Sequence, residues 1–426
     1  MNVLLVHNFY QQPGGEDQVF ADETRLLRDR GHDVRQFTVH NNAVEGMGRL
    51  ELARRTIWNR AAYDELRAAA QSHRADVVHF HNTLPLISPA GYRAAHDAGA
   101  AVVQTLHNYR LLCPTATFYR DGGVCEDCMG RFVPWPGVVH KCYRDSRAAS
   151  AVIATMLTVH RALRTYRDEI DVFIALTEFS RRKFIEGGLP AEKIVVKPNF
   201  VDPDPGVGNG GGGFALFVGR LTEEKGVGTL LHAWETLRGE VPLRILGDGP
   251  LRPRVEQTAA RRELGIDYLG RQPLEKVSAM MGESALLIFP STWYEGLPRT
   301  IVESFAKGTP VIASDLGSMT ELVEDGRTGF LFAPGDAAAL AGRVRLATGA
   351  AAGARQEMRR AARGAYERLY TAERNYGMLL SAYEMALRRV RPGGVASSSS
   401  WVAAAPADRR DAVQGETTAT PRVASR

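Results

Sequence analysis

The 426-residue sequence has no apolar run long enough to cross a membrane and contains only four cysteines. A membrane-spanning helix needs about 20 consecutive apolar residues, and no window of the sequence meets that requirement. The first residues, MNVLLVHNFY, lack the basic region and small-residue cleavage site of a signal peptide, so we expect a cytoplasmic protein. Four cysteines are too few for a disulfide scaffold in a chain of this length.

The sequence also lacks a strong charge excess and the common nucleotide-binding motifs. Its 53 lysines and arginines exceed its 48 acidic residues by only +5. No helix-turn-helix, RNP or zinc-finger pattern accompanies this excess, so nucleic acid is not an expected partner. The GxGxxG loop of dinucleotide oxidoreductases and the GxxxxGK[ST] loop of P-loop NTPases are absent. Apolar residues make up 44% and charged residues 24%, which are ordinary values for a folded globular chain.

Short apolar runs rich in β-branched residues alternate with helical stretches. These runs lie at 3–7, 33–39, 76–80, 101–106, 171–177 and 193–198, and again at 214–219, 243–249, 285–291 and 310–314. Buried parallel strands have this composition because helices cover both faces of their sheet. The pattern predicts an α/β protein built from two Rossmann-like domains in tandem.

Composition marks the boundaries of these domains. Residues 1–201 are predicted to form the first domain, with an insertion at about 107–150 that is too long for a simple loop. The Pro/Gly-rich stretch 202–213 is predicted to be a linker, followed by a second domain at 214–370. We expect 371–391 to form a helix that can cross back to the first domain, and 392–426 to be a disordered tail.

The segment 285–314 carries the strongest chemical pattern. A buried strand ends at Pro290 and a helix is predicted to begin near Pro298, so Glu295 lies in the connecting loop and Glu303 on the helix. In open parallel sheets, ligands bind at the carboxyl ends of the strands, where a helix N-terminus favours an anion. Two carboxylates beside such a site suggest a sugar–phosphate ligand. The alternative is that Glu295 caps the helix and Glu303 is solvated.

Two cations, Arg220 and Lys225, follow the first strand of the second domain. Arginine binds phosphate with a planar fork and lysine as a point charge, so the pair suits a diphosphate. The alternative is a pair of surface cations bridged to neighbouring glutamates. Gly270 and Arg271 end another predicted strand at the same sheet edge, where they suit either a base contact or a purely structural turn.

The first domain contributes Gly14, Gly15 and His107. The two glycines follow the first strand and let the backbone approach a ligand just before a helix begins. His107 directly follows the strand at 101–106, where an imidazole can donate to a sugar hydroxyl or a phosphate. A structural histidine is the alternative.

Together these motifs closely resemble the retaining glycosyltransferases of family four (glycosyl transferase group 1), which have the GT-B fold. The resemblance covers residues 1 to about 390. It rests on GRLTEEKG, LGDGP, FPSTWYEGLPRTIVESFAKGTPVIAS and ELVEDGRTGFLFAPGD in the second half, and on GGEDQVFADETRLLRDRGHDV in the first. It implies two facing Rossmann-like domains with a deep cleft between them.

The resemblance also implies a function. The second domain would bind a nucleotide-diphosphate-sugar donor, and the first a glycan or lipid-linked acceptor. The expected activity is that of a retaining, metal-independent hexosyltransferase in cell-surface polysaccharide or glycolipid synthesis. No cofactor is required for catalysis and no protein nucleophile is expected, because the acceptor hydroxyl is thought to attack from the front face.

Carried over by position, the resemblance assigns roles to the charged residues. Glu295 would face the hydroxyls of the donor sugar, and Glu303 the ribose diol. Arg220 and Lys225 would hold the donor diphosphate and stabilise its leaving charge, while His107 would lie near the transferred sugar.

The uncharged part of the donor site is carried over in the same way. The backbone at Gly296 and Leu297 would meet the sugar and phosphate. Gly14 and Gly15 would form the first-domain loop near the diphosphate. Gly270 and Arg271 remain expected at the base.

Two rival functions stay open. One keeps the architecture but changes the chemistry, as in a sugar-nucleotide epimerase or a phosphorylase, although no lysine motif for a phosphorylase cofactor is evident. The other is a non-catalytic sugar-nucleotide-binding partner. The presence of Glu295, Glu303, Arg220 and Lys225 argues against the second rival.

All four cysteines fall in the insertion, as Cys113, Cys125, Cys128 and Cys142, with the spacing C-x11-C-x2-C-x13-C. This spacing fits a structural tetrathiolate zinc site, with free thiols or an iron–sulfur cluster as alternatives.

Two basic amphipathic helices are predicted at 50–71 and 150–170. They would suit peripheral contact with the inner face of a membrane, or packing of their apolar faces on the sheet.

Overall fold

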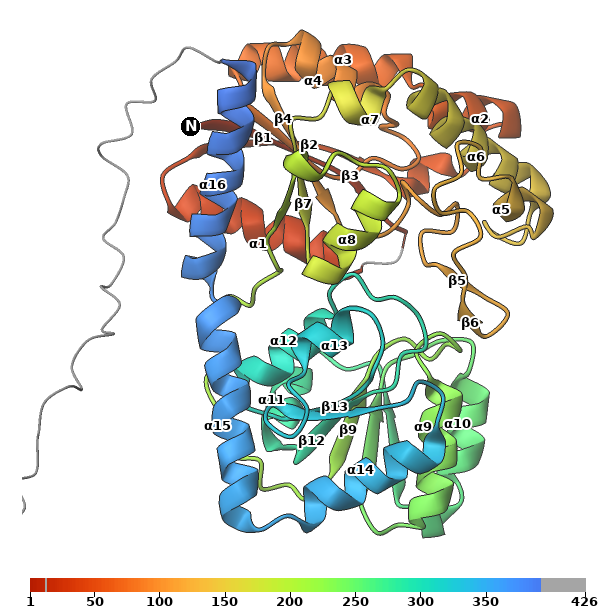
Figure 1. The fold of residues 1–426 in the computed structure, drawn as a ribbon, viewed down its shortest axis with the longest axis vertical. Helices are drawn as coiled ribbons and strands as arrows, with labels where there is room; N and C mark the ends of the chain where they lie inside the picture. The colour runs from red at the N-terminus through yellow and green to blue at the C-terminus, as the bar shows by residue number, and fades with distance from the viewer. Residues whose placement is uncertain (12–13, 392–426) are drawn as a thin grey trace, which may run out of the picture. The chain divides into compact units, whose positions relative to one another are not determined.

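The computed structural model describes residues 1–11 and 14–391, so the tail predicted at 392–426 lies outside the described residues. Residues 1–200 contain a six-stranded parallel sheet with the strand order β2-β1-β3-β4-β7-β8 (Figure 1). Its strands are β1 (Asn2–Phe9), β2 (Asp33–His40), β3 (Val77–Asn82), β4 (Ala101–Leu106), β7 (Val172–Ala175) and β8 (Ile194–Val196). Strands β3, β4 and β7 are buried along their whole length, as their apolar sequences predict.

The second sheet is also six-stranded and parallel, with the order β11-β10-β9-β12-β13-β14. Its strands are β9 (Ala215–Val218), β10 (Leu243–Leu246), β11 (Ile266–Gly270), β12 (Leu286–Phe289), β13 (Val311–Ser314) and β14 (Gly329–Phe332). The strand order reverses between β9 and β12, which is the point at which open α/β sheets bind ligands. The predicted α/β architecture with two Rossmann-like sheets is therefore confirmed.

Helices connect the strands in both halves of the chain. Those around the first sheet are α1 (Gly15–Asp29), α3 (Arg60–His73), α4 (Ala90–Asp97) and α8 (Glu178–Glu186), with the short helices η1 (Asn41–Val44) and η2 (Ala191–Lys193). Those around the second sheet are α9 (Val227–Leu237), α10 (Arg252–Ala259), η3 (Arg262–Leu264), α11 (Leu274–Glu283), α12 (Arg299–Ala306), α13 (Ser318–Leu322), α14 (Ala337–Gly349) and α15 (Ala352–Leu369). None of the helices in the described ranges combines the length and apolar character needed to cross a bilayer.

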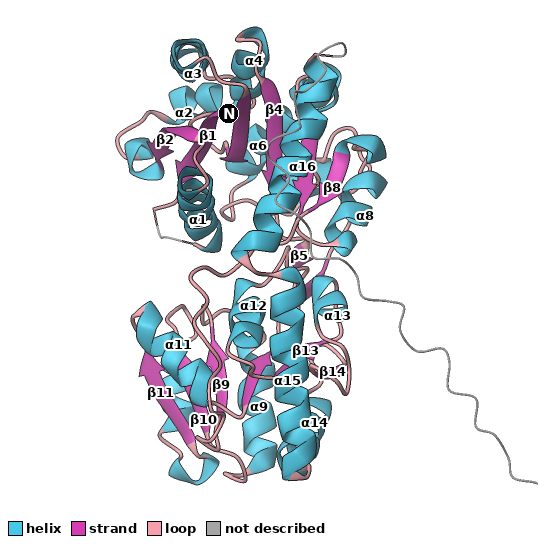
Figure 2. Ribbon diagram, turned by 90° about the vertical axis from the view of Figure 1, so that its left-hand side faces the viewer, coloured by secondary structure: helices cyan, strands magenta, loops and turns pink. Residues whose placement is uncertain are grey.

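The last helix, α16 (Ala372–Val390), returns to the first sheet and packs against β4 and β7 (Figure 2). Its buried residues Leu379 and Tyr383 join the same apolar cluster as Val3 and Val103. The segment 202–213 contains no helix or strand, but it is held against the second domain. The Gly208 amide donates to the Lys307 carbonyl at 2.9 Å, and a Cβ atom at Gly208 would lie 2.1 Å from the Gly282 carbonyl oxygen.

The two long helices predicted at 50–71 and 150–170 are each divided. The first becomes α2 (Arg49–Ile57) and α3, because Trp58 is extended and the Asn59 side chain caps α3 by accepting from the Ala62 amide. The second becomes α6 (Arg147–Ala162) and α7 (Thr165–Asp168), separated at Arg164, which has a positive φ of 56°. The insertion between β4 and α6 also holds a hairpin, β5 (Tyr119–Arg120) and β6 (Gly123–Val124), and the short α5 (Trp135–Val139).

Candidate functional site

Glu295 lies in the loop after β12, buried at the carboxyl edge of the second sheet. Three donors converge on its Oε1: Lys225 Nζ at 2.6 Å, Trp293 Nε1 at 2.7 Å and Ser291 Oγ at 2.8 Å. Among the described residues no donor reaches Oε2, so this oxygen remains available to hydroxyl groups of a ligand. Glu295 does not cap α12, which begins without a side-chain cap.

The two predicted cations differ in their surroundings. Lys225 pairs with Glu295 rather than with the glutamates beside it in sequence, and its ammonium lies over the Trp293 ring. Arg220 follows β9 and is exposed, and within the described residues its guanidinium makes neither an ion pair nor a hydrogen bond. A free, planar guanidinium at this edge can bind a phosphate without first breaking another contact.

Glu303 lies on the first turns of α12, whose free N-terminal amides face the same edge. Its Oε1 accepts from Arg299 Nε at 2.8 Å, and Arg299 Nη1 donates at 2.7 Å to Asp22 on α1. Burial raises the pKa of Glu303, and the neighbouring Arg299 opposes that increase. Glu303 is therefore part of a charged bridge between the two domains rather than a solvated side chain.

The loop after β12 meets the first domain at Gly296. A Cβ atom at Gly296 would lie 2.9 Å from the His107 carbonyl oxygen, so only glycine allows this approach. The hydroxyls of Thr177 and Ser180 donate to the Gly296 carbonyl at 3.3 and 3.4 Å. The structure thus brings the predicted residues His107, Glu295 and Gly296 together, although they come from different domains. Leu297 instead packs its side chain into the core of the second domain.

His107 is held by a buried polar network in the first domain. Its Nε2 lies 3.0 Å from His81 Nδ1, and His81 Nε2 lies 3.5 Å from the Glu23 carboxylate. Glu23 in turn pairs with the fully buried Lys197 at 2.5 Å. Burial, together with the positive potential of neighbouring imidazoles and of Lys197, holds the pKa of His107 well below its usual range. His107 is therefore a neutral imidazole at physiological pH.

In the described part of the chain, one group of three potential metal ligands lies within 4.8 Å: Glu23, His79 and His81. Some of their ligand atoms are already engaged. Lys197 occupies Glu23, while His79 contacts the Tyr383 hydroxyl at 3.0 Å and the Thr105 hydroxyl at 2.8 Å. Glu23 Oε2 and His81 Nε2 lie 3.5 Å apart and have no hydrogen-bond partner among the described residues. A cation bound there would compete with the buried Lys197 ammonium.

Gly14 and Gly15 open α1 beside the carboxyl end of β1. The Gly14 amide donates to Asp17 Oδ2 at 2.7 Å, and among the described residues no atom lies within 4 Å of a Cβ built at Gly15. The next residue, Glu16, was not singled out from the sequence. Burial raises its pKa to about 7, although a hydrogen bond from Tyr10 lowers it.

Gly270 and Arg271 lie at the end of β11, next to the Gly-Asp-Gly turn after β10. The Gly247 amide donates to the Gly270 carbonyl at 3.0 Å, and a Cβ atom at Gly247 would lie 1.8 Å from the Gly219 carbonyl oxygen. The ends of β9, β10 and β11 therefore converge. Arg271 is exposed, and none of its contacts in the described part of the chain assigns it a ligand.

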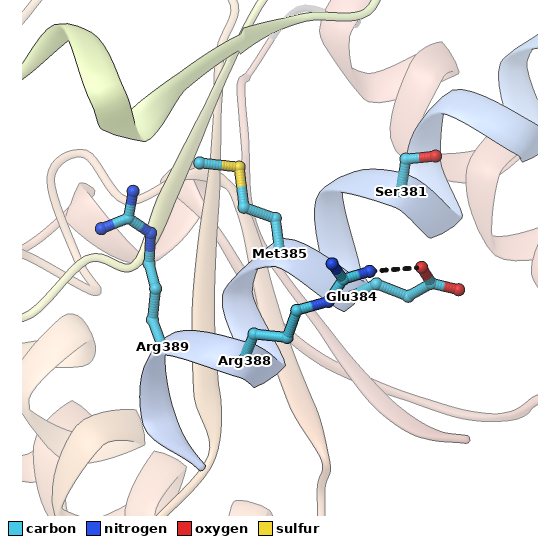
Figure 3. Close-up of a pocket in the computed structure, with 5 residues that line it drawn as sticks. All are labelled: Ser381, Glu384, Met385, Arg388 and Arg389. Carbon is cyan, nitrogen blue, oxygen red and sulfur yellow. Dashed lines mark hydrogen bonds and ion pairs between the residues drawn. The ribbon is translucent and has the colours of Figure 1, made fainter. Parts of the chain in front are cut away.

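The hollow in Figure 3 lies on α16, away from the residues described above, and is lined by Ser381, Glu384, Met385, Arg388 and Arg389. Arg388 pairs with Glu384 at 3.2 Å, and Arg389 donates to the Glu192 carbonyl. None of the predicted site residues belongs to this hollow. A second hollow lies at the carboxyl edge of the first sheet, lined by residues that include Tyr10, Thr83, His107, Asn108 and Arg110.

The fold is that of a two-domain α/β protein, with two cations and a helix N-terminus at one sheet edge of its second half. Two family models match it: Glycosyltransferase Family 4 at residues 13–205 and Glycosyl transferases group 1 at residues 204–365. Together they span both domains, and the chain belongs to this glycosyltransferase family.

Several relatives match one part of the chain. It is 29% identical over 194 residues to the amylovoran biosynthesis glycosyltransferase AmsK of Erwinia amylovora, which covers 40% of this chain and 46% of that protein. It is 30% identical over 193 residues to the putative colanic acid biosynthesis glycosyltransferase WcaL of Salmonella typhimurium, covering 41% and 47%. These matches span about half the length of either relative.

Solved structures share the whole fold. Anabaena Alr3699/HepE in complex with UDP aligns with a TM-score of 0.65 at 18% identity, covering 90% of this chain and 100% of that one. Sucrose-phosphate synthase from Thermosynechococcus elongatus aligns with a TM-score of 0.67 at 17% identity, covering 91% and 99%. At these identities the likeness concerns the fold.

Proposed function

We propose that this protein transfers a sugar, with retention of anomeric configuration, from a nucleotide-diphosphate-sugar to a glycan or lipid-linked acceptor. The observation that carries the proposal is the set of groups around one sheet edge: the free Oε2 of Glu295, the Glu303 carboxylate, the unpaired Arg220, and the N-terminus of α12. The relatives named above are an amylovoran biosynthesis glycosyltransferase and a putative colanic acid biosynthesis glycosyltransferase, and the solved neighbour Alr3699/HepE is in complex with UDP, which favours the same class of donor.

The donor side follows from charge. A nucleoside diphosphate carries its negative charge on the two phosphates, which Arg220 and the α12 amides can bind. Lys225, already paired with Glu295, adds positive charge at the same edge. Carboxylates accept from vicinal diols, so Glu303 suits the ribose and Glu295 the sugar.

The chemistry requires stabilisation of the leaving diphosphate as the anomeric bond breaks. Preorganised donors are the strongest means of doing this, and here Arg220, Lys225 and the α12 amides supply them without a metal ion. A leaving phosphate oxygen would accept the proton of the attacking acceptor hydroxyl. The neutral His107, positioned by His81, can donate to a hydroxyl of the transferred sugar.

The acceptor would enter the hollow at the carboxyl edge of the first sheet. Tyr10, Thr83 and Asn108 offer hydroxyl and amide groups for sugar hydroxyls, and Arg110 offers a guanidinium for an acceptor phosphate. This combination suits a phosphate-linked glycan, as found on a lipid carrier.

An exposed apolar surface on the insertion supports a membrane-bound acceptor. Val124, Phe132, Val133, Trp135 and Val139 are all exposed. The exposed Arg131 lies among them in the sequence, and the exposed Lys141, Arg144 and Arg147 follow them. Apolar side chains with surrounding cations bind the surface of an anionic bilayer. We therefore propose that this surface contacts the inner membrane face peripherally.

The activity is tested with a panel of nucleotide sugars, with and without lipid extract. We expect turnover of at least one donor, inactivation by Glu295→Gln, and an α-linked product from an α-linked donor by NMR. If no donor is turned over, the proposed enzymatic activity is refuted. If the anomeric centre is inverted, the proposed retaining mechanism is refuted. Formation of an epimerised nucleotide sugar without acceptor would favour the epimerase rival.

The membrane contact is tested by co-sedimentation with vesicles. We expect binding to vesicles containing anionic phospholipid, weaker binding to zwitterionic vesicles, and loss of binding in Phe132→Ser/Trp135→Ser. Leu346→Ser, on the exposed surface of the second domain, is the matched control. Equal binding by the double variant and the control would refute this surface.

A further inference from the structure

The proposed transfer reaction leaves the four cysteines of the insertion without a role. All four are free thiols. Cys113 and Cys128 are buried, and Cys125 and Cys142 are half-buried. The insertion is otherwise poor in regular structure, with a two-residue-per-strand hairpin and the five-residue α5. Such a segment has little apolar core of its own to hold it in one shape.

Three stretches of backbone bring these cysteines into the same part of the insertion. Gly137 packs on Pro114, so closely that a Cβ atom there would lie 2.7 Å from the proline ring. Pro114, the residue after Cys113, therefore lies against α5. The Cys142 amide donates to the Gly137 carbonyl at 2.9 Å. Cys128 Sγ lies 3.8 Å from the Pro134 carbonyl oxygen at the start of the same helix.

Cys125 and Cys128 form a turn of the kind that presents two sulfurs to one ion. The Cys125 amide donates to the Phe118 carbonyl at 2.7 Å, and the Met129 amide donates to the Glu126 carbonyl at 2.9 Å. Gly130 follows with a positive φ of 69°, a conformation that glycine adopts without strain. The C-x2-C spacing and the two flanking cysteines match the ligand pattern of structural zinc sites.

We infer that Cys113, Cys125, Cys128 and Cys142 bind one zinc ion as a tetrathiolate site that braces the insertion. In the described residues no three cysteine sulfurs lie within 4.8 Å of one another. A tetrahedral site with Zn–S bonds of about 2.3 Å requires an S···S spacing of about 3.8 Å. The loops that carry the cysteines must therefore move closer together when zinc binds. Binding breaks four S–H bonds, releases four protons to solvent and forms four Zn–S bonds. Metal binding therefore completes the folding of this segment.

The brace would act on the contact between the domains. Phe118, beside the hairpin, has its ring centroid 6.1 Å from that of Tyr294, the residue before Glu295. Glu126, between the two central cysteines, pairs with Lys183 on α8 at 3.0 Å. Zinc would fix the insertion that makes these contacts and presents the exposed apolar surface, without touching the donor groups.

The test measures metal in the full-length protein, purified without an affinity metal. We expect about one zinc per chain by mass spectrometry, and four thiols that react with a thiol reagent only after a chelator or denaturant is added. Cys128→Ser should lose the zinc, while Met129→Leu, the adjacent control, should keep it. Zinc near zero with four reactive thiols, two disulfides, or iron and sulfide in place of zinc would each overturn the proposal.

A second measurement tests the site even if Cys128→Ser does not fold. Cobalt added to the metal-free protein should give the strong visible bands and the thiolate charge-transfer band of a tetrahedral sulfur site, and Cys125→His should still bind one metal because histidine replaces a thiolate ligand. Weak octahedral cobalt bands would overturn the site. Cys125→Ser should leave the affinity for UDP unchanged. The metal measurements therefore test the zinc site, and UDP binding separately tests the donor site of the proposed function.

Discussion

Replacing Glu303 by glutamine should weaken nucleotide binding while leaving the fold intact. The substitution keeps the shape of the side chain and one acceptor oxygen but removes the charge. A hydrogen bond to a charged acceptor contributes about 1.5–3 kcal/mol, and the loss of that contribution corresponds to a Kd raised about 10- to 150-fold.

The structure also sets the expected stability change. Arg299 contacts both Glu303 and Asp22, with side-chain exposures of 17%, 30% and 2% respectively. In Glu303→Gln the guanidinium keeps Asp22 as a charged partner, so no buried charge is left alone. We therefore expect the free energy of unfolding to change by less than about 1 kcal/mol.

Isothermal titration with UDP measures the affinity, and urea unfolding measures the stability. Glu324→Gln is the matched control, because this exposed glutamate pairs with Arg327 in the same domain. Burial raises the pKa of Glu303, so wild-type affinity should fall as the pH drops toward that raised pKa, whereas the glutamine variant should show a flat profile. A folded variant with unchanged Kd would refute the assignment of Glu303 to the donor.

Three further substitutions test other parts of the site. Arg220→Ala should lower kcat/KM about 10- to 100-fold with an unchanged Tm, since Arg220 makes no ion pair in the described chain; a parallel fall in Tm would contradict this. Gly296→Ala should lower kcat because its Cβ would lie 2.9 Å from the His107 carbonyl oxygen, and wild-type kinetics would contradict that contact. Glu16 has a pKa raised from 4.5 to about 7, so its ionisation destabilises the fold increasingly as pH rises between these values. Relative to wild type, the free energy of unfolding of Glu16→Gln should rise by on the order of 1–3 kcal/mol from pH 5 to pH 8, as measured by urea unfolding. The same difference between variant and wild type at both pH values would contradict the raised pKa.

The positions of the strands along the chain, and of the loop after β12, follow from local sequence. The apolar runs at 285–291 and 310–314 become β12 and β13, and the helix expected near Pro298 begins at Arg299. Strand burial and helix initiation depend on neighbouring residues, so a pattern of apolar and cap residues predicts them. The alternation likewise predicted two parallel α/β sheets, which the structure contains.

Predictions from local sequence were wrong where a long-range contact opposed a local preference for helix. The stretch 50–71 has helical periodicity, yet it forms two helices because Asn59 caps the second and its amide donates to Ser88, which is 29 residues away. Glu16 gave no pattern in the sequence, because its raised pKa results from burial beside Tyr10 and Asp17 in the folded chain.

The sequence by itself determined which residue types stand at each strand end: Glu295, Arg220 and Lys225 in one half, and His107 in the other. Only the tertiary structure decided their partners. Glu295 takes Lys225 from a segment 70 residues away, and Arg299 joins Glu303 to Asp22 across 277 residues. Chain periodicity carries information over a few residues, whereas ion pairs between domains depend on how two sheets meet, and that geometry is set by packing across the whole molecule.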